Sequence, residues 1–169
     1  MGNIAVYPGS FDPITNGHLD LLERGLKIFD RIIIAIAANP GKSPLFSIDE
    51  RCEMIRAALA EHPLGERVTV DLFHGLLVDY VNTIPARAIL RGLRAISDFE
   101  YEFQMALMNR RLNPDVETLF IMTGMRWIYI SSRIIKEVVM SGGSVSGLVP
   151  TIVERKLAEK LPGQNNTLY

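Results

Sequence analysis

The sequence predicts an α/β fold in which a doubly wound, five-stranded parallel sheet is covered by helices. Short runs rich in β-branched residues alternate with longer segments whose apolar residues recur at helical spacing. The run at 31–38 is apolar on both faces, as central parallel strands are. Parallel strands need crossover connections, and these are right-handed. The 169 residues suit one domain over 1–169, with a flexible tail expected at 162–169.

Five segments are expected as strands because they are short, apolar and followed by turn residues. Pro8 and Gly9 close the first strand, and a loop rich in proline and glycine follows the second. In chain order the expected strands are 3–7, 31–38, 68–73, 87–90 and 118–122.

Six segments are expected as helices. The first has an apolar stripe from Leu19 to Phe29, and the second begins at a capping box of Ser47 and Glu50. Asn113-Pro114 and the glycines after Met140 end the fourth and fifth. The expected helices are 18–29, 48–60, 76–84, 98–112, 131–140 and 151–161.

Composition excludes several classes of function. The 18 basic residues against 19 acidic ones leave a net charge of -1, whereas proteins that bind nucleic acid usually carry a basic excess. The single cysteine, Cys52, excludes an internal disulfide and a Cys-rich zinc site, and we expect it to be buried in a helix. The apolar run at 32–38 is too short to span a bilayer. We therefore expect a cytoplasmic protein with no nucleic-acid or membrane partner.

Glycines, hydroxyls and cations gather where the predicted strands end. Ligands of doubly wound sheets bind outside the carboxyl ends of the strands. The residue types there include few carboxylates, which predicts a site for an anion such as phosphate. The four segments are 8–18, 39–42, 91–94 and 123–133.

The first of these segments lies between a strand and a helix. Thr15 or Asn16 can cap the helix, and His18 in its first turn can donate to a phosphate oxygen. No G-x-G-x-x-G follows the first strand, so a dinucleotide fingerprint is absent. The triplet 41–43 resembles the end of a phosphate-binding P-loop, but Ile36 stands where its first glycine belongs. We therefore reject a P-loop.

Each of these residues also has a purely structural interpretation. Lys42 fits a solvated loop, and Trp127 fits the core. Arg91 and Arg94 can pair with the carboxylates of the segment 98–102. His62 and His74 have no companion at metal-ligand spacing, so no metal ligand is expected from the protein.

Three strings taken together resemble bacterial phosphopantetheine adenylyltransferases: Tyr7 to His18, Arg91-Gly92-Leu93-Arg94, and Asp98-Phe99-Glu100-Tyr101-Glu102. Thr15-Asn16-Gly17-His18 matches the T/H-x-G-H signature of the wider nucleotidyltransferase superfamily, and the resemblance extends from Ile4 to about Leu161.

The resemblance implies a Rossmann-like nucleotidyltransferase fold and an activity. The family transfers AMP from ATP to 4′-phosphopantetheine, giving dephospho-CoA and pyrophosphate, in the penultimate step of coenzyme A biosynthesis. Attack is expected to be direct and in line, without a covalent intermediate. The resemblance further implies Mg²⁺ as cofactor, a homohexamer and feedback inhibition by coenzyme A.

The resemblance also implies roles for individual residues. His18 matches the transition-state stabiliser, and Lys42, Arg94 and Ser10 complete the expected catalytic set. The positions that match pantetheine contacts are Ser10, Lys42, Leu77, Arg91 and Asn109. The positions that match ATP contacts are Ser10, Phe11, His18, Gly92, Leu93, Arg94, Glu102, Trp127, Ile128, Tyr129, Ile130, Ser131, Ser132 and Arg133.

Some residues depart from the family pattern. Ser10 stands in place of a threonine, so the hydroxyl is kept and a methyl group is lost. The segment 123–126 and Arg133 differ from the Pro-Ser and Ser-Ser-Ser patterns of the family. These departures fall at the expected triphosphate end, where an added arginine is electrostatically compatible.

Three alternative functions remain open. A sister enzyme would use another phosphorylated acceptor, such as nicotinamide mononucleotide or glycerol phosphate. A non-catalytic sensor of adenine nucleotides would keep the fold, although the joint presence of His18, Lys42 and Arg94 argues against it. RNA binding is disfavoured because there is neither a basic excess nor an appended domain.

Overall fold

A computed structural model of the chain describes residues 2–38, 43–94 and 96–161. The expected loop residues 39–42 and the expected tail lie outside these ranges. Within the described part, five parallel strands form one sheet in the order β3-β2-β1-β4-β5, which confirms the predicted fold class. The strands are β1 (Ile4–Gly9), β2 (Arg31–Ala37), β3 (Val68–Phe73), β4 (Ala88–Leu93) and β5 (Glu117–Met122).

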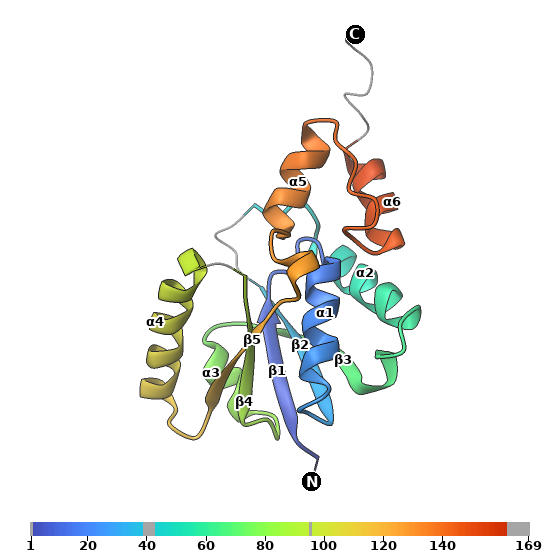
Figure 1. Cartoon of the computed structure of the whole chain (residues 1–169). Coiled ribbons are helices and arrows are strands. Elements are labelled where there is room, and N and C mark those ends of the chain that lie inside the picture. The colour runs from blue at the N-terminus through green and yellow to red at the C-terminus, as the bar shows by residue number, and fades with distance from the viewer. Residues whose placement is uncertain (1, 39–42, 95, 162–169) are drawn as a thin grey trace.

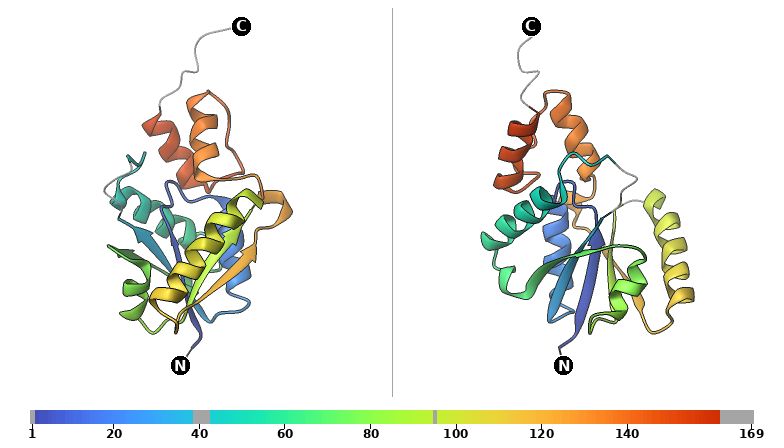
Figure 2. Two further views of the ribbon diagram at one scale, coloured as in Figure 1. Left: turned by 90° about the vertical axis from the view of Figure 1, so that its left-hand side faces the viewer. Right: turned by 180° about the vertical axis from the view of Figure 1, so that it is seen from behind.

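Helices cover both faces of the sheet (Figures 1 and 2). They are α1 (Asn16–Gly25), α2 (Ile48–Ala60), α3 (Leu77–Asn82), α4 (Ile96–Leu112), α5 (Ser132–Met140) and α6 (Thr151–Lys160), with short 3₁₀ turns η1 (Gly65–Arg67) and η2 (Met125–Trp127). Helices α1 and α2 lie on one face, α3 and α4 lie on the other, and α5 and α6 lie beyond the carboxyl ends of the strands. Among the residues described, no helix has the length and apolar character needed to cross a membrane.

The strand alternation divides the core between the two faces of the sheet. Ala5 and Tyr7 belong to the larger cluster, which packs against α1 and α2, whereas Val6 between them belongs to the smaller cluster beside α3. Cys52 on α2 is buried, with 6% of its surface exposed, as expected. Because both faces of the central strands are covered, the strand ends are where this sheet can offer polar groups to a ligand.

Several element boundaries differ from the sequence-based expectation. Strand β1 continues through Pro8 and Gly9, which pair with Ala35 and Ile36 of β2. Helix α1 ends at Gly25, and the expected stripe continues through the buried Phe29 without helical structure. These ends depend on neighbouring elements, which a local pattern does not reveal.

Strand β4 was expected to end at Leu90 but continues to Leu93. The extension pairs with β5, where Arg91 lies opposite Phe120 and Leu93 lies opposite Met122. Arg91 is therefore a strand residue rather than a loop residue, and its place beside the site is set by the ladder with β5.

Pairing between β1 and β4 is shorter. It is limited to Ala5 with Ala88 and Val6 with Ile89, whereas β4 and β5 pair from Ala88 to Leu93. The strand order reverses between β1 and β4, which is the switch point where such sheets bind ligands. The site is therefore expected above these two strands.

Candidate active site

Two adjoining cavities open at the carboxyl ends of β1 and β4. The larger has a volume of about 490 Å³ and the smaller about 330 Å³. Both are lined by Pro8, Gly9, Ser10, Arg91, Glu102, Ser132 and Arg133. Because the cavities share this wall, two ligands bound in them would meet at the end of β1.

His18 lies in the first turn of α1 and lines the smaller cavity. The backbone N–H of Thr15 donates to His18 Nδ1 over 2.9 Å. Because Nδ1 accepts this hydrogen bond, the proton of the neutral ring is on Nε2. Burial lowers the pKa of His18 to about 4, together with the charges of Arg94 and Arg91. His18 is therefore a neutral hydrogen-bond donor at physiological pH.

Two aromatic rings pack against the imidazole of His18. The centroid of the Phe11 ring lies 5.1 Å from that of His18 and 5.3 Å from that of Tyr7. Phe11 adopts a left-handed backbone conformation with φ of 46°, and its side chain is buried. A Cβ on Gly9 would come within 2.9 Å of Phe11 Cε2, so glycine leaves room for this ring. The strained loop thus restricts the orientation of His18.

Arg91 forms an ion pair, as the purely structural interpretation of this residue predicted. Its Nε donates to Glu102 Oε2 over 2.7 Å, and its Nη2 donates to Glu102 Oε1. Its Nη1 donates to the carbonyl oxygen of Pro8 over 2.9 Å. One guanidinium therefore connects β4, α4 and β1 in the wall that the two cavities share.

Arg94 follows β4 and lines the smaller cavity opposite the start of α5. Its Nη1 donates to the carbonyl oxygen of Ile130 over 3.0 Å. Ser131 caps α5, because its Oγ accepts from the backbone N–H of Ile134 over 3.1 Å. The smaller cavity thus combines a guanidinium with the N-terminus of a helix, an arrangement suited to an anion.

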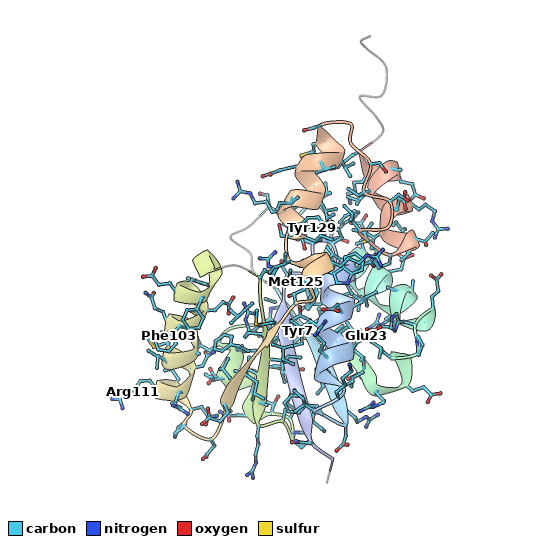
Figure 3. The ribbon with its side chains drawn as sticks, in the orientation of Figure 1. Tyr7, Glu23, Phe103, Arg111, Met125 and Tyr129 are labelled. Carbon is cyan, nitrogen blue, oxygen red and sulfur yellow. The ribbon has the colours of Figure 1, made fainter. Side chains whose placement is uncertain are left out.

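Most positions that match ATP contacts lie together. Those that line the smaller cavity are Ser10, Phe11, His18, Gly92, Arg94, Glu102, Ile130, Ser131, Ser132 and Arg133. In the part of the chain that the structure describes, Leu93, Trp127, Ile128 and Tyr129 line neither cavity. Trp127 instead packs against the core, as its structural interpretation predicted, and Tyr129 is exposed near the start of α5 (Figure 3).

The positions that match pantetheine contacts lie around the larger cavity. Ser10, Leu77, Arg91 and Asn109 all line it, although they come from four separate segments. Lys42 lies outside the described residues, so its expected role stays a prediction. Tyr101 and Met105 of α4 also line the larger cavity, although the sequence analysis gave neither residue a role in the site.

Three charged residues of the larger cavity were missed. Asp12 pairs with Lys136, whose Nζ lies 2.6 Å from Asp12 Oδ2, and Arg51 Nη1 donates to the carbonyl oxygen of Ser10 over 2.8 Å. One signal was available, since Lys136 follows Ser132 by one helical turn and therefore shares its face of α5.

The segment 123–126, which departs from the family pattern, is anchored by α1. The carboxylate of Asp20 accepts from the backbone N–H of Gly124 over 2.8 Å and pairs with Arg24 over 2.8 Å. A Cβ on Gly124 would lie 2.9 Å from an Arg24 nitrogen. Thr123 lines the smaller cavity, so this anchored segment forms part of its wall.

The fold and the site define a class of protein. Residues 6–138 match the cytidylyltransferase-like family. A solved structure, a candidate nicotinate-nucleotide adenylyltransferase from Vibrio parahaemolyticus, superposes with a TM-score of 0.68 over 95% of each chain at 20% identity. At that identity the likeness concerns the fold, which is that of the nucleotidyltransferases.

Relatives with similar sequences identify the family within this class. The chain is 61% identical to the phosphopantetheine adenylyltransferase of Desulfosudis oleivorans, covering 94% of this chain and 92% of the relative. It is 59% identical to that of Syntrophus aciditrophicus, covering 98% of each chain. The chain belongs to the phosphopantetheine adenylyltransferase family.

The protonation of His18 gives a first prediction. We expect its imidazole to titrate near pH 4 in the folded protein and to carry its proton on Nε2 above that pH. Because the unfolded chain binds this proton near pH 6.5, the free energy of unfolding should fall as pH drops from about 6.5 towards 4. Nitrogen-detected NMR reports the tautomer and the midpoint, with His18→Gln identifying the resonance. A midpoint near 6.5, or a proton on Nδ1, would contradict this assignment.

Proposed function

We propose that the chain transfers the adenylyl group of ATP to 4′-phosphopantetheine by direct in-line attack, giving dephospho-CoA and pyrophosphate. The observation that carries the proposal is the pair of adjoining cavities with a shared wall at Ser10 and Arg91. In this proposal, ATP binds in the smaller cavity and phosphopantetheine binds in the larger one. The phosphate of the acceptor then meets the α-phosphate of ATP at the shared wall.

The nucleophile in this reaction needs little help from the protein. A phosphate monoester is already anionic at neutral pH, so no general base is required. The difficulty is to align two polyanions that repel each other and to stabilise the charge that develops at the α-phosphate. A site that supplies cations and neutral hydrogen-bond donors meets that need.

The groups that supply this stabilisation come from three elements. His18 Nε2 donates as a neutral group from α1, Arg94 adds charge after β4, and the N-terminus of α5 adds its dipole. Lys42, which lies outside the described residues, completes the proposed set as a cation for the acceptor phosphate. Each donor acts most strongly once ATP has displaced water from the cavity.

The larger cavity has the character that a pantetheine arm requires. Leu77, Met105 and Ala106 offer apolar surface for its methylene groups, and the buried Asn109 offers an amide. The arm alternates such apolar stretches with amides, so both kinds of group have partners in the wall.

We also propose that Mg²⁺ accompanies ATP rather than occupying a site built by the protein. Among residues 2–38, 43–94 and 96–161, no three His, Cys, Asp or Glu side chains gather as a metal site. Mg²⁺ keeps several water ligands and commonly binds through phosphate oxygens, which fits a cavity of hydroxyls and cations. When bound, the ion would neutralise charge on the triphosphate.

An assay of the purified protein tests the function. Incubation with ATP, Mg²⁺ and 4′-phosphopantetheine should release pyrophosphate and form dephospho-CoA. Nicotinamide mononucleotide and glycerol phosphate, offered in parallel, should give little or none. Faster release with either would favour a sister enzyme, and tight ATP binding without turnover on any acceptor would favour a sensor.

Removal of the proposed stabiliser gives a sharper test. In His18→Ala we expect kcat to fall on the order of 10²–10³-fold, as for loss of an oxyanion-hole donor, with ATP affinity largely kept. His62→Ala serves as the control, because His62 lies outside both cavities. If calorimetry showed ATP affinity falling in proportion to kcat, His18 would be a binding residue rather than a stabiliser.

We further propose that the protein is a cytoplasmic homohexamer inhibited by coenzyme A. Helix α4 exposes large apolar side chains, which supports self-association. They are Phe99, Tyr101, Phe103, Met105, Leu107, Met108 and Leu112, of which Tyr101 and Met105 also line the larger cavity. Coenzyme A contains both the adenylate and the pantetheine arm, so the joined cavities suit it as a competing ligand.

The assembly is tested by a matched pair of substitutions. Light scattering should give six times the mass of one chain for the wild type and a smaller mass for Leu107→Glu. Ile28→Glu is the control, because Ile28 is exposed to a similar extent, 53% against 50%, but lies after α1. A hexamer that survives Leu107→Glu would argue against α4 as the contact surface.

A further inference from the structure

The carboxylate of Asp12 joins three segments of the chain. Asp12 lies in the loop between β1 and α1, two residues after Ser10, and only 5% of its surface is exposed. It accepts from the backbone N–H of Leu45 over 3.0 Å, from that of Phe46 over 2.9 Å and from Lys136 Nζ over 2.6 Å. Both of its oxygens are thus used, and the three bonds connect its own loop to two other segments, 45–46 and α5.

The partners of Asp12 belong to different walls of the site. Leu45 and Phe46 follow Ser43 and Pro44, which line only the larger cavity. Lys136 projects from α5, whose first residues, Ser132 and Arg133, line both cavities. The Asp12 carboxylate therefore connects the acceptor side of the site with the helix that begins at the nucleotide side.

Two further bonds brace the same loop. Ser132 Oγ donates to the carbonyl oxygen of Pro13 over 2.7 Å, and Arg51 Nη1 donates to the carbonyl oxygen of Ser10 over 2.8 Å. Both bonds hold the backbone on either side of Asp12. Because Ser10 precedes Asp12 closely and the start of α5 is bonded to Pro13, a displacement of Asp12 would shift both Ser10 and the start of α5.

The ion pair keeps Asp12 charged. Burial alone would raise the pKa of this carboxyl, but Lys136 and the two backbone N–H groups outweigh burial and lower it. Loss of Lys136 would leave a buried carboxylate without its counter-charge, a strongly unfavourable state. The loop would then relax towards water or towards other donors.

We propose that Asp12 and Lys136 are positioning residues that hold the two cavities in the relative placement needed for transfer between them. The role rests on the proposed adenylyl transfer. Neither residue is required to touch the reacting atoms. Because the reaction joins two separately bound anions, a small shift of one cavity against the other affects the transfer step more than the binding of either substrate.

The test compares Lys136→Met and Lys136→Arg with a matched control, Lys156→Met. Lys156 pairs with Glu53 and has the same side-chain exposure as Lys136, 24%, but it lies outside both cavities. Full-length variants are assayed for pyrophosphate release from ATP and 4′-phosphopantetheine, with kcat divided by the folded fraction from circular dichroism. For Lys136→Met we expect kcat to fall on the order of 10–100-fold with each KM within about threefold of the wild type. Lys136→Arg keeps the charge and should recover most of the loss.

The outcomes separate the two proposals. A kcat for Lys136→Met close to that of Lys156→Met, a loss confined to KM, or no recovery in Lys136→Arg would overturn the positioning role while leaving the function in place. Asp12→Asn provides a second route, because it keeps the shape and removes the charge, and it should show the same loss in kcat. A wild-type protein that releases no pyrophosphate from these substrates would refute the function and the positioning role together.

Discussion

The brief pairing of β1 with β4 is the constraint on which the rest of the site depends. β1 pairs with β4 only at Ala5 and Val6, after which these two strands separate. Backbone groups released by such a separation need other partners. One such group is the carbonyl oxygen of Pro8, which accepts from Arg91 Nη1. Arg91 thus bridges β4 and β1, and it also lines both cavities.

Charge in the site is arranged so that the protein is stable before its ligands arrive. Arg91 is balanced by Glu102, Lys136 is balanced by Asp12, and His18 is kept neutral by its buried surroundings. Cations that face a polyanion would otherwise repel one another across an empty cavity. The near-zero net charge of the whole chain is consistent with this local balancing.

Prediction from sequence succeeded where a local signal exists. The capping box of Ser47 and Glu50 begins α2 as expected, because its bonds join residues three positions apart. The predicted ends of β1 and β4 were wrong, because where these strands end depends on pairing with neighbouring strands. The position of His18 followed from its motif, and the bond from the N–H of Thr15 that sets its tautomer is equally local. Its low pKa depends instead on burial and on Arg94 and Arg91, which belong to a distant segment of the chain. Asp12 and Lys136 are 124 residues apart, and no local pattern links them.

The division between the two cavities has a consequence for how this fold can change. Several residues that line only the larger cavity come from α3 and α4, among them Leu77, Met105 and Asn109. None of these three lines the smaller cavity, whose own lining includes His18 of α1 and Arg94 after β4. Substitutions at Leu77, Met105 or Asn109 can therefore reshape the larger cavity without altering the lining of the smaller one. If the two substrates bind as proposed, a lineage could exchange the molecule that accepts the nucleotide and still keep the cavity proposed for ATP.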